Sequence, residues 1–162
     1  MKSLRLIFIN LIVTLTITNK NNMSSSTKLS TSVKALCYLE QLYPKAVSST
    51  EIATTIGINS SKLRMILSML SKNDIVESNS GTSGGFKLKK SASEIHLQEI
   101  YCAIEDRKAF HLDVRKESIK KNSLPDKLNY YFLDFFTEVQ VDIEDKMKKI
   151  TLESIINKIK SY

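Results

Sequence analysis

The sequence contains little of what builds disulfide-rich, membrane-spanning or catalytic proteins. Its two cysteines, Cys37 and Cys102, are too few for a disulfide scaffold and fit a reducing compartment, so we expect a cytoplasmic protein. An apolar run at residues 6–18 is too short to cross a bilayer comfortably. No nucleophile, general base and oxyanion-stabilising donors are suggested together, and we therefore expect the protein not to be an enzyme.

The first 22 residues resemble a signal peptide only in part. Basic Lys2 and Arg5 precede the apolar run, but no small-x-small cleavage site follows it. Met23 then opens a polar segment that is a natural start for a cytosolic chain. We interpret residues 1–22 as upstream sequence or a misassigned start, with a signal segment or membrane anchor as the alternative.

The stretch from residue 48 to residue 90 has the parts of a winged helix-turn-helix in their proper order. Ser48 and Glu51 stand at capping-box spacing. Gly57 suits the left-handed conformation that ends a helix, and Asn59 is a good N-cap for the next one. In that second helix apolar residues recur at i, i+3, i+4 and i+7, which predicts one buried face. These residues are Leu63, Ile66, Leu67 and Leu70.

A two-stranded hairpin is expected after the second helix. Asn73 and Asp74 tolerate positive φ and should end the helix, and a strand should begin at Ile75. Glycines between residues 81 and 85 punctuate a turn before the alternating strand at residues 86–88. A glycine-rich run can also cradle phosphate, but such a loop precedes a helix, whereas lysine-rich strand residues follow here. We therefore interpret the run as the turn of a wing.

These parts resemble the BadM-type (Rrf-two) winged helix-turn-helix regulators, the family that includes IscR and NsrR. The resemblance lies in SVKALCYLEQL, SSTEIATTIGINSSKLRMILSMLSKNDIVES, GTSGGFKLKK and EIHLQEIYCAIED, and it covers residues 28–106 well. It implies a transcriptional regulator that binds double-stranded DNA. Relatives commonly carry an arginine just before the wing glycines, where this chain has Ser80. This departure implies a smaller contribution of the wing to minor-groove recognition.

The outer face of the second helix carries hydroxyls and cations but no carboxylate, which suits a polyanion. Arg64 is the best candidate for base reading, because a bidentate arginine–guanine contact is the commonest specific one. Lys62, Lys72 and Lys87 are expected at phosphates, with solvated surface charges as the alternative. The predicted DNA-binding residues are Ser49, Thr50, Ser60, Ser61, Lys62, Arg64, Ser68, Lys72, Ser80, Gly81, Thr82, Ser83 and Lys87. An ordinary helical hairpin with a β-ribbon is the plainer alternative.

Helical spacing predicts further helices on both sides of the motif. The first runs from Ser30 to Pro44, with Leu29, Val33, Leu36 and Tyr43 on one stripe. The second follows His96 at its N-cap, with Leu97, Ile100, Tyr101 and Ile104 on one stripe and Cys102 off it. The last is capped by Thr151 and places Leu152, Ile155, Ile156 and Ile159 on one face.

The longest periodic segment, residues 126–150, would form a helix of roughly 35 Å. A small three-helix core cannot cover its aromatic-rich stripe, so we expect a partner chain to do so and predict a homodimer. The wall of a small-molecule pocket is the alternative. We therefore divide the chain into residues 1–22, a winged helix-turn-helix domain at 23–106, a loop at 107–125 and dimerisation helices at 126–162.

Cluster-binding relatives have three cysteines in the segment that matches residues 108–121, where this chain has only His111. We therefore expect no iron–sulfur cluster, no metal site and no other cofactor. Cys37 and Cys102 are candidate redox sensors, and the plainer interpretation makes both of them bystanders.

Taken together, these features predict a mainly α fold with a small β-wing and a long C-terminal dimerisation helix. The predicted function is that of a homodimeric repressor on an inverted repeat that responds to a small molecule or an oxidant. No membrane partner is expected. A membrane-tethered or protein-binding winged helix is the alternative.

Overall fold

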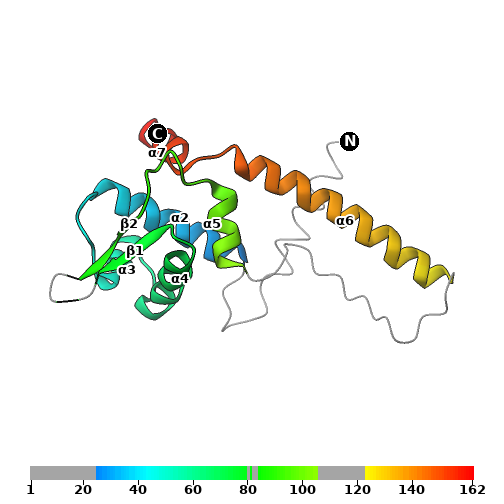
Figure 1. Ribbon diagram of the computed structural model, residues 1–162, viewed down its shortest axis with the longest axis horizontal. Coiled ribbons are helices and arrows are strands. Elements are labelled where there is room, and N and C mark those ends of the chain that lie inside the picture. The colour runs from blue at the N-terminus through cyan, green and yellow to red at the C-terminus, as the bar shows by residue number, and fades with distance from the viewer. Residues whose placement is uncertain (1–24, 80, 82–83, 106–122) are drawn as a thin grey trace.

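The computed structural model describes residues 25–79, 81, 84–105 and 123–162. They form a winged helix-turn-helix body from which one long helix projects (Figure 1). The elements are α2 (Ser25–Gln41), α3 (Ser49–Ile56), α4 (Ser60–Lys72), β1 (Val76–Asn79), β2 (Gly85–Leu88), α5 (Leu97–Ile104), α6 (Leu124–Lys148) and α7 (Leu152–Lys160). The predicted mainly helical fold with a two-stranded wing and a long C-terminal helix is confirmed.

A single hydrophobic cluster joins α2, α3, α4, α5 and the wing. All four residues predicted for the core face of α4 are fully buried: Leu63, Ile66, Leu67 and Leu70. Ile52 of α3 and Ile100 of α5 are buried with them. Complete burial of a leucine or isoleucine side chain stabilises the fold by about 1.5–3 kcal/mol. This packing holds the opposite face of α4 toward solvent.

Local capping sets the angle between α3 and α4. Ser48 Oγ accepts a hydrogen bond from the Glu51 amide at 3.1 Å, and the Glu51 carboxylate accepts one from the Tyr38 hydroxyl at 3.3 Å. Gly57 ends α3 in the left-handed conformation, with φ 69° and ψ 41°. The Asn59 side chain then accepts bonds from two amides in the first turn of α4. The capping residues that predicted the turn between α3 and α4 therefore also form it.

The wing is tied to the body through the connection between α2 and α3. β1 and β2 pair antiparallel along their whole lengths. Val47 exchanges backbone hydrogen bonds with Phe86 of β2, at 2.9 Å and 2.8 Å. A Cβ atom on Gly85 would lie 2.6 Å from the Val47 carbonyl oxygen, so only glycine allows this close approach.

The chain returns to the body after α6. Leu152 of α7 is fully buried and Ile156 nearly so, and both belong to the same core cluster as the winged helix. Backbone hydrogen bonds join Leu152 to Ile95 at 2.8 Å and Leu97 to Ile150, also at 2.8 Å. The two helices within residues 126–162 therefore differ, because α6 projects from the winged-helix body whereas α7 packs on it. The domain boundaries themselves stay a prediction.

Helix α2 differs from its predicted bounds at both ends. It begins at Ser25 rather than Ser30 and ends at Gln41, three residues before Pro44. The placement of Tyr43 on its buried stripe was therefore wrong: the residue lies beyond the helix and is 60% exposed. Helical periodicity does not extend past the point where the helix ends.

Two further differences concern the C-terminal helices. α6 begins at Leu124, so its first two residues fall in the predicted loop, and Ser123 caps it. Pro125 fits there because proline is tolerated in the first turn of a helix. Thr151 caps α7 as predicted, but Ile159 on its predicted apolar face is 58% exposed. The last turn of α7 extends past the part of the helix that is buried.

Candidate nucleic-acid interface

The outer face of α4 lies opposite the buried leucine and isoleucine side chains. Its exposed side chains are Ser61, Lys62, Arg64, Met65, Ser68 and Lys72. Since successive residues turn by about 100°, Ser61, Met65 and Lys72 lie near the middle of this face and Arg64 on its flank. The structure thus brings together the residues predicted on α4 with the exception of Ser60, which is half-buried at the start of the helix. Met65 belongs to the same face, although it was not among the predicted DNA-binding residues.

The cations of α4 have no counter-ion among the described residues. In the part of the chain that the structure describes, no carboxylate lies within ion-pair distance of Lys62, Arg64 or Lys72. The first turn of α4 also contains no acidic residue. Such unpaired cations can displace the counter-ions condensed on DNA, which is the main electrostatic source of affinity for phosphate backbones.

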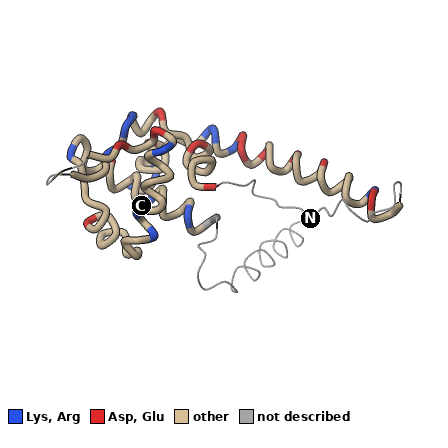
Figure 2. The backbone as a smooth tube through the Cα atoms, turned by 60° about the horizontal axis from the view of Figure 1, so that its bottom comes forward, with Lys and Arg blue, Asp and Glu red and all other residues tan. Residues whose placement is uncertain are grey.

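The lysines that follow the wing turn are arranged differently, because each forms an ion pair. The pairs are Lys87–Glu77 at 3.0 Å, Lys89–Asp74 at 2.6 Å and Lys90–Glu99. Hydrogen bonding and charge from Lys89 lower the pKa of Asp74. Basic and acidic positions are interspersed over the body of the molecule (Figure 2). The wing is therefore less cationic toward a ligand than its lysine content suggests.

The wing turn lies between two paired strands. Gly81 is exposed with φ 112°, and its carbonyl accepts a hydrogen bond from the Gly84 amide at 2.9 Å. The strand that follows rules out a phosphate loop, so the interpretation as a wing turn is confirmed. Thr50 is exposed in the first turn of α3, and Ser49 beside it is half-buried. The predicted residues Ser80, Thr82 and Ser83 lie outside the described residues.

The two thiols lie on separate helices in surroundings that disfavour the thiolate. Cys37 is half-buried on α2, and burial raises its pKa. Cys102 is exposed on α5, where partial burial and the nearby Glu144 carboxylate raise its pKa. The Gln98 amide donates a hydrogen bond to Cys102 Sγ at 3.3 Å. Because the thiolate is the reactive form, these surroundings do not favour rapid oxidation, and the redox sensor stays a prediction.

The membrane alternative rests on residues 1–22, which lie outside the described residues. Within the ranges that the structure describes, none of the helices combines the length and the apolar character needed to span a bilayer.

A helix-turn-helix with an acid-free basic face, followed by an antiparallel two-stranded wing, defines the winged-helix class of DNA-binding proteins. The family model of Rrf2, described as an iron-dependent transcriptional regulator, matches residues 25–158. The chain belongs to the Rrf2 family, also called BadM-type regulators. It is therefore a DNA-binding transcriptional regulator and not an enzyme.

Individual relatives are distant. The HTH-type transcriptional regulator YwnA of Bacillus subtilis is 28% identical over 110 residues, which span 68% of this chain and 81% of YwnA. A transcriptional regulator from Lactobacillus plantarum has a similar structure, with a TM-score of 0.70, 21% identity and coverage of 82% and 89% of the two chains. IscR of T. potens gives a TM-score of 0.62 at 22% identity, covering 86% and 89%. These structures support the fold.

Iron, which the family description names, has no evident ligand set here. Iron–sulfur clusters are usually held by four cysteines, some replaced by histidine. The whole sequence has two cysteines and two histidines. Among the described residues no group of three or more His, Cys, Asp or Glu side chains could hold a metal ion. His96 starts α5 without a side-chain capping bond, and His111 lies outside the described residues. These residues do not fit such a cluster, and the expected lack of a cofactor stays a prediction.

Proposed function

We propose that this Rrf2-family regulator is a homodimeric repressor that places one α4 helix in each of two successive major grooves. The observation that carries the proposal is the outer face of α4, which joins unpaired cations and short hydroxyls without a carboxylate. Two such helices on one face of B-DNA are about 34 Å apart, so a two-fold dimer selects an inverted repeat. A dimer bound across a promoter excludes polymerase, which makes repression the simplest outcome.

Different side chains of the interface have different tasks. Arg64 reads a guanine edge, because its planar guanidinium can donate two parallel hydrogen bonds. Lys62 and Lys72 bind phosphates, and the hydroxyls of α3 and α4 position the helix on the backbone and bases. These hydroxyls belong to Ser49, Thr50, Ser60, Ser61 and Ser68. The wing residues Ser80, Gly81, Thr82 and Ser83 contact the adjacent backbone, and Lys87 adds a weaker contact because Glu77 already pairs with it.

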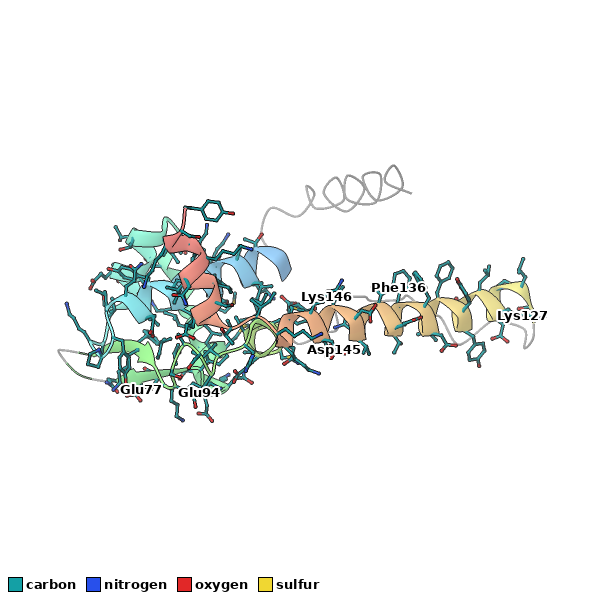
Figure 3. All side chains as sticks on the ribbon, turned by 90° about the horizontal axis from the view of Figure 1, so that it is seen from above. Glu77, Glu94, Lys127, Phe136, Asp145 and Lys146 are labelled. Carbon is teal, nitrogen blue, oxygen red and sulfur yellow. The ribbon has the colours of Figure 1, made fainter. Side chains whose placement is uncertain are left out.

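The support for a dimer comes from α6. At 25 residues it is about 37 Å long, and its only buried residues are Gln140 and Met147 in its C-terminal half. Side chains stand out from the helix along its length, with Lys127 at the far end and Lys146 near the body (Figure 3). Exposed apolar residues cover the outer part of the helix: Leu124, Leu128, Tyr130, Tyr131, Phe132, Leu133, Phe135 and Val141. Apolar area of this extent favours cover by a second copy.

The signal to which the repressor responds is a small molecule or an oxidant. α5 packs against the C-terminal half of α6. A signal that shifts these two helices would therefore couple the DNA-binding body to the proposed dimer surface on the outer part of α6. The raised pKa values of Cys37 and Cys102 favour the small molecule over the oxidant.

Binding of the purified chain to duplex DNA tests the proposal. Specific sites are selected from random duplexes, and affinity is then measured over a salt series. Arg64→Ala should lower specific affinity by about 5- to 150-fold and relax selectivity at one base pair per half-site. Lys72→Ala should weaken binding to all sequences and reduce the salt slope by about one. The matched control is Lys158→Ala, which removes an exposed cation from α7. Failure to enrich any inverted repeat would refute the proposal.

A further inference from the structure

Met65 is an apolar side chain on a face that is otherwise polar. It is 44% exposed, the only large hydrophobic residue of α4 that is exposed to this degree. Its neighbours one helical turn away on the same face, Ser61 and Ser68, are short. The thioether therefore stands above its surroundings near the middle of the outer face.

Single exposed apolar residues are common on protein surfaces, so exposure alone assigns no role to Met65. Its position distinguishes it. The direction opposite the buried residues of α4 lies within about 30° of Met65, whereas Arg64 is about 70° away. When α4 lies in a major groove, the side chain of Met65 is thus aimed at the groove floor more directly than the candidate guanine reader.

The major groove presents only one apolar group, the C5-methyl of thymine. The other groups on the base edges are hydrogen-bond donors and acceptors, which methionine cannot satisfy, or single C–H groups such as cytosine C5–H, which offer less apolar surface than a methyl. Methionine is also unbranched and adaptable, so it can follow the local twist of the groove. A thymine methyl is therefore the group that complements this side chain.

We propose that Met65 packs on the C5-methyl of one thymine in each half-site and so distinguishes thymine from cytosine. The inference rests on the proposed function, since it requires α4 to lie in the major groove. Contact with Met65 removes the methyl from water and gives thymine an advantage that no hydrogen bond supplies.

Uracil tests this contact because it pairs as thymine does and lacks only the methyl. The full-length protein is titrated against its selected site and against variants in which each thymine is replaced singly by uracil. For the wild type, uracil at one position per half-site should reduce affinity about fourfold, with little change elsewhere. Met65→Ala should bind the thymine site more weakly and lose no further affinity on uracil substitution.

The control is Ser68→Ala, which alters the same face and should keep the uracil penalty. A wild-type protein that tolerates uracil at every position would overturn the inference, as would an undiminished penalty in Met65→Ala. Either result would leave the selected inverted repeat, and hence the proposed function, intact. If no site is enriched at all, the proposed function and the inference fall together.

Discussion

Whether a lysine of this protein can bind phosphate depends on whether a carboxylate already pairs with it. Lys62 and Lys72 stand on an acid-free helix face, whereas Lys87 lies opposite Glu77 in the β1–β2 register. An exposed ion pair contributes little to stability. It does, however, offset a positive charge that would otherwise attract phosphate, and Glu77 thereby limits the attraction of the wing to any DNA sequence.

Glu77→Gln should release Lys87 from its ion pair. We expect tighter binding to random duplex DNA and a salt slope that is steeper by about one, since one more cation becomes free to displace counter-ions. Titration of DNA over a salt series measures both quantities. Glu153→Gln on α7 removes the same charge from an exposed site away from the wing and is the matched control. If both variants changed DNA affinity and salt slope equally, the cause would be net charge and not the release of Lys87.

The thiols should react slowly at neutral pH. Because the pKa of each is raised, less thiolate is present at pH 7 than in an ordinary cysteine with a pKa of about 8.5. Alkylation followed by mass spectrometry should show rates that rise with pH, with Cys37 slower because it is half-buried. Glu144→Gln should speed modification of Cys102, since it removes a nearby negative charge.

The oxidant alternative makes the opposite prediction. A fast-reacting Cys102 would lose DNA binding on brief exposure to peroxide, and Cys102→Ser would abolish that loss. Slow alkylation together with unchanged binding would leave a small molecule as the signal.

The wing depends on a backbone contact that one residue type permits. Gly85→Ala would place Cβ 2.6 Å from the Val47 carbonyl oxygen, and the nearest atoms are all Val47 backbone, so no flexible side chain can move aside. We expect a loss of about 1–3 kcal/mol in the free energy of unfolding, as for other overpacked sites. Urea denaturation measures it. The control Ser78→Ala changes an exposed position on β1 and should stay within about 0.5 kcal/mol. Similar values for both variants would show that the hairpin moves without cost.

The same contact matters for function because β2 holds the wing against the connection that leads into α3. A Gly85→Ala protein that stays folded should therefore bind DNA less tightly than Ser78→Ala. The difference reports how much of the affinity depends on the position of the wing.

The described residues form a compact body from which a single long helix projects (Figure 1). Along the outer part of α6, aromatic rings stack on one another within the chain, as Tyr131 does on Phe135 with ring centroids 6.2 Å apart. Contiguous exposed apolar surface of this kind marks an interaction site. The proposed dimer would provide this cover and would also fix the separation of the two α4 helices.

Charges on the α6 stripe should separate the subunits. Phe132→Asp combined with Phe135→Asp is expected to give a monomer in sedimentation experiments and to weaken binding to the inverted repeat strongly, because a monomer engages only one half-site. The control, Thr137→Asp, places one aspartate on another side of the helix and should leave the dimer intact. A double variant that remains dimeric would locate the interface elsewhere.

Local elements were largely predictable because short-range rules govern them. The caps at Ser48, Asn59 and Thr151, the left-handed Gly57 and the buried face of α4 all follow from spacing over a few residues. The bounds of α2 and α6 were less accurate, since local signals define the ends of helices poorly. Among the candidate DNA-binding residues, periodicity located those on α4 and predicted nothing about the pairing of Lys87.

The amino-acid sequence by itself determined the helix-turn-helix, the wing and the acid-free outer face of α4. It did so because helix periodicity, capping residues and turn glycines act within one or two turns of chain. Only the tertiary structure decided that α7 packs on the winged-helix body, that carboxylates pair with the wing lysines and that the C-terminal half of α6 contacts α5. These features depend on residues from different elements of the chain. An apolar stripe predicts that a helix face is buried, but it does not identify the element that buries it.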